Sequence, residues 1–221
     1  MSIQRPVPPP RRSRGRPAKI TRDKVIDAVL LLLEESAPDE VSMADVAEQL
    51  AVPVMSLYNH FPNTSELMQA VADHTFGLFR MPVIRNGAPW EDELLAWLRA
   101  LAKHFRRYPV ALRMISIEGR ATPAWQRIVS PLLRVLQSLG VDDQRAALLV
   151  AWVTSQAMGL IYIEDFAEPA RRLTPPVSTE DNNHEGWVSA VNQALPAVRR
   201  EQVFELGFRS LISVLQEEVE K

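Results

Sequence analysis

The chain has 221 residues, of which 47% are hydrophobic, and its formal net charge at pH 7 is −2. A chain of this length and apolar content can bury a substantial core, which excludes a disordered protein. It contains no cysteine, which excludes disulfides, thiol catalysis and cysteine zinc sites and is typical of a reducing cytoplasm.

The positive charge gathers at the amino-terminal end. Residues 1–24 contain eight Lys or Arg and one acid, a net charge of +7, which leaves −9 on residues 25–221. Five prolines and few apolar residues predict a disordered basic arm over residues 1–20. Within it, Arg14-Gly15-Arg16-Pro17 resembles the core of an AT-hook, in which two arginines enter a narrow A·T-rich minor groove. A solvated tail that contacts phosphates non-specifically is the alternative.

Three short helices are predicted next. Thr21 can cap the first, which has a wide apolar face. Ser42 and Asp45 have the spacing of a capping box and predict the start of a second helix. Pro53 suits the start of a third over residues 54–60, whose outward side chains are small and able to form hydrogen bonds. Two short helices joined by a tight turn form a helix-turn-helix, although many helical hairpins are only packing units.

The third helix makes this interpretation more specific. Residues 56–63, Ser-Leu-Tyr-Asn-His-Phe-Pro-Asn, resemble the Thr-Leu-Tyr-x-His-Phe signature of the tetracycline-repressor (TetR) family, and residues 41–67 align with its helix-turn-helix without a gap. The resemblance implies phosphate contacts from Ser42, Tyr58 and His60, and base contacts from Pro53, Val54, Ser56 and Asn59. Thr64 replaces a phosphate-binding lysine of the family and completes the predicted DNA-binding residues, and Ala51 stands where glycine is usual. The alternative is that Tyr58 and His60 only close a small core.

Residues 68–221 predict a larger helical bundle. A fourth helix leads out of the helix-turn-helix to about Arg80, and further helices are predicted over residues 89–109, 110–117, 123–139, 143–165, 186–194 and 201–218, with a loop over 166–183. No segment alternates like a strand. The predicted fold class is all-α, with a three-helix helix-turn-helix DNA-binding domain over residues 21–67 and a ligand-binding and dimerisation bundle over residues 68–221. Residues 203–215 also resemble the element that closes the carboxy-terminal domain of the tetracycline-repressor branch.

The bundle contains side chains suited to a ligand pocket, because a mostly apolar wall with a few polar groups suits a small molecule. The predicted ligand-binding residues are Trp97, His104, Phe105, Met114, Trp125, Trp152, Gln156, Met158 and Tyr162. Plain core packing is the alternative for each. The helix over residues 145–163 is apolar nearly all round, which indicates a second subunit. The predicted dimer interface is Leu149, Trp152, Phe204, Phe208, Leu211 and Leu215.

Catalytic and metal-binding patterns are missing. The histidines at positions 60, 74, 104 and 184 have no close metal-ligand spacing, and no Ser-His-Asp order or glycine-rich phosphate loop stands out. We therefore expect no enzyme, no metal and no cofactor. No apolar run approaches 18 residues and the amino terminus lacks the apolar core of a signal peptide, so we expect a cytoplasmic protein without a membrane partner.

The resemblance and these features predict a ligand-responsive transcriptional regulator. As a repressor it would bind a palindromic double-stranded DNA operator as a homodimer, and a small, largely apolar effector in the bundle would release it. The alternative is a helical binding or scaffold protein without DNA function, which would show no affinity for duplex DNA at physiological salt.

Overall fold

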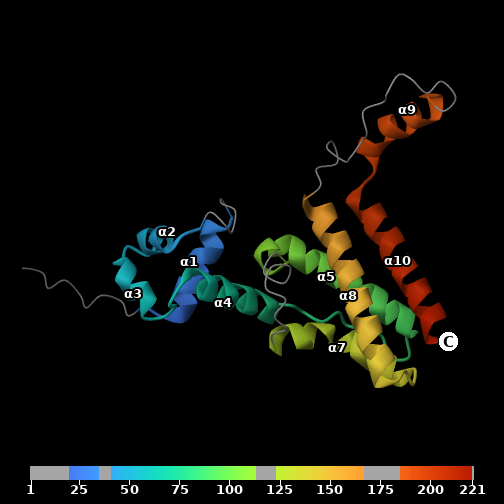
Figure 1. Cartoon of the computed structure of the whole chain (residues 1–221), viewed down its shortest axis with the longest axis horizontal. Helices are drawn as coiled ribbons and strands as arrows, with labels where there is room; N and C mark the ends of the chain where they lie inside the picture. Colours follow the sequence, from blue (N-terminus) through green and yellow to red (C-terminus); the bar gives the residue numbers. More distant parts are fainter. Residues whose placement is uncertain (1–19, 35–40, 113–122, 167–184, 221) are drawn as a thin grey trace, which may run out of the picture. The chain divides into compact units, whose positions relative to one another are not determined.

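The computed structural model describes residues 20–34, 41–112, 123–166 and 185–220, and it is shown in Figure 1. The predicted all-α fold is confirmed, since no strand occurs in these ranges. The chain divides into two compact units, one that ends at Leu67 and one that begins at Met68.

The first unit contains α1 (Arg22–Leu32), α2 (Met43–Gln49) and α3 (Val54–Tyr58). Thr21 caps α1, where its side chain accepts a hydrogen bond from the Lys24 amide over 3.3 Å. Side chains from all three helices, together with two that follow α3, form a small core closed to water: Val25, Val29, Val46, Leu57, Phe61 and Leu67. Because Leu57 and Phe61 anchor the chain on this core, the orientation of α3 is fixed relative to α1 and α2.

The turn between α2 and α3 has the hydrogen bonds of a Schellman motif. The Val52 amide donates to the Ala47 carbonyl over 3.0 Å, and the Ala51 amide donates to Glu48 over 2.9 Å. This motif requires a left-handed residue directly after the helix cap, and Ala51 takes that position with φ of +52°. The unusual alanine noted in the sequence is therefore a strained residue.

Helix α4 (Thr64–Gly77) begins in the first unit and ends in the second. Asn63 caps it, since its Oδ1 accepts a hydrogen bond from the Glu66 amide over 2.8 Å. The segment that joins α4 to the next helix contains the expected breaks at Pro82, Gly87 and Pro89.

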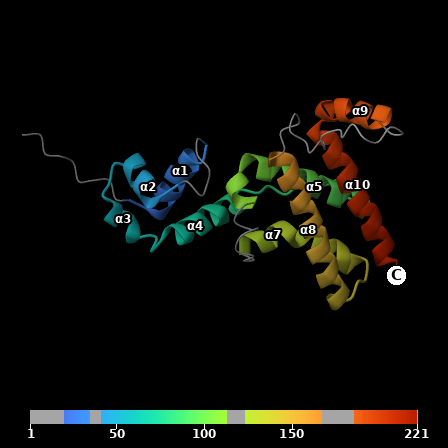
Figure 2. The same cartoon turned by 45° about the horizontal axis from the view of Figure 1, so that its top comes forward.

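The second unit continues with α5 (Trp90–Arg107), α7 (Pro123–Ser138), α8 (Asp143–Phe166), α9 (Glu185–Ala194), a 3-10 turn (Leu195–Ala197) and α10 (Arg200–Val219). Its core is formed by the end of α4 with α5, α7, α8 and α10. Helix α10 packs along both α8 and α5 (Figures 1 and 2). At Gly207 of α10 the side chain of Leu160 occupies the space that a Cβ would take, so glycine sets how closely α10 approaches α8.

Helix α8 is long and apolar enough, by length and composition alone, to cross a membrane over Asp143–Glu164, and 28% of this stretch is buried in the unit. One side of the helix packs into the bundle core through Leu149, Val153, Ala157 and Ile161. A helix that is apolar on all sides and covered on only one of them exposes an apolar face, which is typical of a contact with a further apolar partner.

Candidate nucleic-acid interface and ligand pocket

The predicted DNA-contacting side chains around α3 are accessible to solvent. Ser42, Pro53, Tyr58 and Asn59 are exposed, and Val54, Ser56, His60 and Thr64 are partly exposed. Tyr58 retains 44% of its surface, so it does not close a core. Arg14 and Arg16 lie outside the described residues.

Ser42 is already engaged in capping α2. Its amide donates to Asp45 Oδ2 over 2.8 Å, its hydroxyl donates to the same oxygen over 2.6 Å, and the Asp45 amide returns a bond of 3.3 Å to Ser42 Oγ. The hydrogen bonds from Ser42 lower the pKa of the Asp45 carboxyl. This capping box fixes the start of α2 and therefore the turn that leads into α3.

Arg22 holds the end of α3 in place. Its Nη1 donates to the His60 carbonyl over 2.6 Å, and its guanidinium lies 4.2 Å from the centre of the Phe61 ring. Carbonyls at the end of a helix lack partners and attract a cation, and the aromatic face adds a cation–π contact. From the sequence, Arg22 is only one of the basic residues at the amino terminus. No local signal links it to His60, 38 positions away.

Met55 lies beside the predicted DNA contacts of α3 and is not one of them. It is 72% exposed on α3, one residue before Ser56. An exposed apolar side chain on such a helix can contact the methyl group of thymine. Its solvent-facing position was predictable from helical periodicity.

The predicted ligand-binding residues do not form one pocket. Three of them line a cavity of about 500 Å³, whose walls are Trp125 of α7 with Thr154, Ser155, Met158, Gly159, Tyr162 and Ile163 of α8. Trp152 and Gln156 are not among the residues that line this cavity. Trp97 and Phe105 are completely buried, and the Trp97 indole donates to the Ile128 carbonyl over 2.8 Å. Met114 lies outside the described residues.

His104 belongs to an aromatic cluster in the core. Its ring centre lies 5.3 Å from Phe79, 5.6 Å from Phe105 and 5.1 Å from Tyr108. Burial lowers the pKa of His104 to about 4, against a hydrogen bond with the Thr75 backbone that raises it. Its Nε2 has no partner among the described residues. The imidazole is therefore neutral at pH 7 and connects α5 to α4.

Phe76 of α4 extends this cluster to the cavity. Its ring lies 6.3 Å from Phe105, edge to face, and 6.0 Å from Trp125. Since Trp125 is also a wall of the cavity between α7 and α8, the Trp125 indole ring lies between that cavity and Phe76 of α4.

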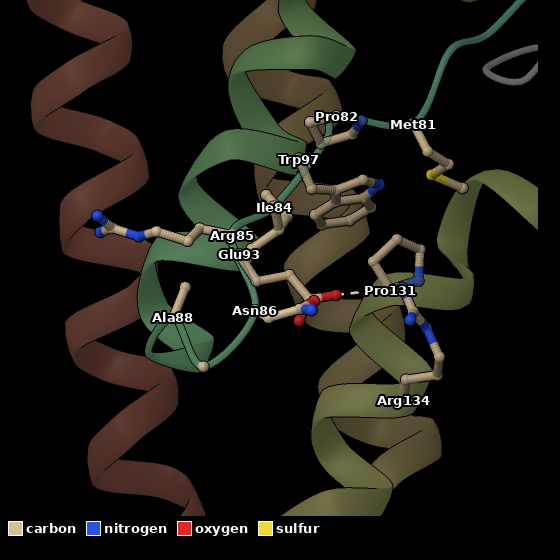
Figure 3. A pocket seen from close by; sticks show the side chains of 11 residues that line it. Met81, Pro82, Ile84, Arg85, Asn86, Ala88, Glu93, Trp97, Pro131 and Arg134 are labelled. Carbon is tan, nitrogen blue, oxygen red and sulfur yellow. Dashed lines mark hydrogen bonds and ion pairs between the residues drawn. The ribbon is translucent and has the colours of Figure 1, made fainter.

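A second cavity, of about 350 Å³, lies beside the segment 81–88 and is shown in Figure 3. Its walls are more polar, and they include an ion pair of 3.1 Å between Glu93 of α5 and Arg134 of α7. Figure 3 shows the Arg85 side chain directed away from this pair. Of the predicted ligand-binding residues that the structure describes, only Trp97 contributes to this cavity.

Most of the predicted dimer residues are buried within the protomer. Leu149, Phe208, Leu211 and Leu215 retain between 0% and 9% of their surface, and Phe204 stacks on Phe208 at 5.5 Å. Packing inside the protomer already covers these four side chains, and their place in a dimer interface stays a prediction. The large apolar side chains that stay exposed on α8 and α10 are Leu148, Tyr162, Ile163, Leu206 and Val214.

The family model of bacterial regulatory proteins, tetR family, matches residues 25–71. An HTH-type transcriptional regulator of Saccharopolyspora erythraea is 30% identical over 115 residues, which are 52% of this chain and 48% of the relative. The chain therefore spans about half the length of that relative. The class D tetracycline repressor protein of Escherichia coli is 25% identical over 201 residues, 88% of each chain.

A solved structure with a similar fold is the TetR family protein ActR of Streptomyces coelicolor in complex with actinorhodin. It superposes with a TM-score of 0.75 at 20% identity and covers 92% of this chain and 100% of that chain. At 20% sequence identity, this similarity shows only that the two proteins share a fold.

Proposed function

Because the chain belongs to the TetR family of bacterial regulators, we propose that it is a transcriptional repressor that binds a palindromic DNA operator as a homodimer and is released by a small molecule. The observation that carries this proposal is the arrangement of side chains around α3. Leu57 is closed to water, while Tyr58 and Asn59 next to it are exposed. Such a repressor acts in the cytoplasm, where bacterial DNA lies.

In this proposal α3 enters the major groove. Asn59 can form two hydrogen bonds with adenine, Met55 can contact a thymine methyl group, and Tyr58 and His60 bind phosphates. Two copies of α3 must lie about 34–36 Å apart to reach successive grooves, which makes the operator palindromic. The AT-hook-like arm with Arg14 and Arg16 adds phosphate or minor-groove contacts.

The two-fold axis passes by the outer faces of α8 and α10. These faces expose Leu148 of α8 and Leu206 of α10, each more than 60% accessible. A symmetric dimer would cover them with the same residues of the second copy, which supplies the apolar partner that α8 lacks.

The effector site is the cavity between α7 and α8. Met158 and Trp125 provide apolar walls, and Thr154, Ser155 and Tyr162 provide hydroxyl groups. An effector that moves Trp125 acts through Phe76 on α4, which continues into the DNA-binding unit. Couplings of this kind are typically about 1–3 kcal/mol, or 5- to 150-fold in DNA affinity.

The DNA-binding half of the proposal is tested by selecting sequences from a random duplex pool with the full chain and measuring affinities by fluorescence anisotropy. Asn59→Ala should relax the preference at one position of each half-site, at a cost of about 1–3 kcal/mol. The matched double variant Arg14→Ala, Arg16→Ala should lower affinity for all sequences and reduce its salt dependence. Failure to enrich any palindrome would reject the proposal, and a uniform loss in Asn59→Ala would remove Asn59 as a base reader.

The effector half is tested with actinorhodin as the first probe, because the structural relative binds it. If the probe occupies the cavity, Trp125→Ala should weaken binding and Trp187→Ala should not, since Trp187 is 72% exposed on α9. Operator DNA should weaken probe binding by the same factor by which the probe weakens DNA binding. Equal probe affinities with and without operator would rule out induction from this cavity.

A further inference from the structure

A separate groove lies between α5 and α10, on a part of the bundle that the proposed effector site does not use. It has a volume of about 280 Å³ and is lined by Arg99, Ala102, Lys103, Arg106, Glu201, Phe204, Glu205 and Phe208. None of these residues lines the cavity between α7 and α8. Along α10, Leu206 is rotated by about 200° from Phe204 at 100° per residue, so the groove also faces away from the proposed dimer surface.

The floor of the groove is apolar and aromatic. The rings of Phe204 and Phe208 are parallel, with an interplanar angle of 1° and centres 5.5 Å apart. Phe208 is closed to water, Phe204 is partly exposed, and Ala102 of α5 leaves space beside them. A flat ring can lie in this space, because an aromatic partner adds offset stacking to plain burial.

The rim of the groove has an excess of available positive charge. Glu205 is already neutralised, because Arg99 donates to both of its oxygens over 2.6–2.7 Å and Arg209 donates over 2.6 Å. Arg106 and Glu201 are 3.6 Å apart and mostly exposed, which makes this ion pair weak. Lys103 has no ion-pair partner among the described residues. Lys103 and Arg106 are therefore the cations that can accept a further anion.

We propose that this groove binds a small aromatic carboxylate, with its ring against Phe204 and Ala102 and its carboxylate between Lys103 and Arg106. The charge pattern selects the acid over an aromatic cation, since of the two carboxylates that line the groove Glu205 has two guanidinium partners and Glu201 has one. The volume selects one or two fused rings over larger polycyclic compounds, because sites for drug-sized ligands start at roughly 300 Å³.

The test uses 2-naphthoate with the full chain in isothermal titration calorimetry at low and at physiological salt. Naphthoate should bind, and its affinity should fall as salt is raised. The double variant Lys103→Glu, Arg106→Glu should weaken binding at least tenfold. The single change Arg127→Glu is the matched control, because Arg127 is an exposed cation on α7 outside the groove, and it should leave the affinity unchanged.

Two further probes separate ring from charge. The cation 2-naphthylmethylammonium should not compete with naphthoate, and cyclohexanecarboxylate should bind more weakly because it lacks an aromatic face. Circular dichroism and thermal melting confirm that each variant is folded. Wild-type affinity in the folded double variant, competition by the ammonium compound, or no naphthoate binding at millimolar concentration would each overturn the assignment. Operator binding is measured separately, so a failure here leaves the proposed repressor function intact.

Discussion

Ala51 has a left-handed backbone conformation with φ of +52°. This conformation costs a residue with a Cβ roughly 1–2 kcal/mol, whereas glycine adopts it freely but loses about 0.4–1 kcal/mol through the flexibility of the unfolded chain. We predict that Ala51→Gly raises the free energy of unfolding by roughly 0.5–1 kcal/mol, measured by urea denaturation. Ala51→Val should lower it, because a branched side chain is worse in this region. A destabilised glycine variant would contradict this account of the turn.

His104 should make the protein sensitive to mild acid. Its pKa is about 4 in the folded protein and 6.5 as the ordinary value, so between these values the unfolded chain binds a proton that the folded protein does not. The stabilisation is fully present above pH 6.5 and is lost as the pH falls towards 4. The loss amounts to about 3 kcal/mol, at roughly 1.4 kcal/mol per pKa unit.

The measurement for His104 compares unfolding free energies of the wild type and His104→Phe from pH 7.5 to pH 4. The other histidines, His60, His74 and His184, are the same in both proteins. The difference between the two curves should follow the titration of a single group. Parallel curves would show that His104 does not titrate as its burial requires.

The contact between α8 and α10 is decided by one glycine. In Gly207→Ala the new Cβ must displace the Leu160 Cδ2 methyl group, at about 0.5–1.5 kcal/mol for a shifted rotamer, while alanine favours the helix by about 1 kcal/mol. We predict a net change within about 1 kcal/mol. Gly207→Val should cost about 1–3 kcal/mol more through overpacking.

The Gly207 series is checked by chemical denaturation in the wild-type and Leu160→Ala backgrounds. Truncation of Leu160 removes the group that a valine at position 207 would meet. The cost of Gly207→Val should therefore be smaller in that background. If Gly207→Val lowers the free energy of unfolding equally in both backgrounds, the overpacking does not come from contact with Leu160.

At the scale of the whole molecule, the exposed apolar faces of α8 and α10 form the surface that we propose for the dimer. We predict that Leu206→Arg or Leu148→Arg converts a dimer into monomers, because either change places an unpaired charge in an apolar interface. Leu133→Arg is the matched control, since Leu133 is also an exposed leucine but lies on α7. Sedimentation velocity of the three variants measures their state of assembly. If both interface variants remain dimers, these faces do not form the dimer interface.

The sequence by itself determined the order of the described helices and, to within one residue, where they start, whereas α1, α3 and α4 end two or three residues earlier than predicted. Helix starts depend on neighbours within three residues, such as Ser42 with Asp45 and Asn63 with Glu66, and those interactions can be recognised before the fold is known. The same holds for the pattern that places Leu57 inside and Asn59 outside. The fold class and the outline of the candidate DNA-binding surface follow from such local rules.

Only the tertiary structure decided how these helices share their apolar surface. Phe208 and Leu215 have the pattern of an interface, but packing against α5 and α8 buries them in one protomer and leaves Leu206 exposed. Arg22 reaches the end of α3, and Phe76 reaches Trp125, through contacts between residues distant in the sequence. Helical periodicity states which residues face away from solvent. It does not state which neighbour covers them, because that depends on the crossing of helices far apart in the chain.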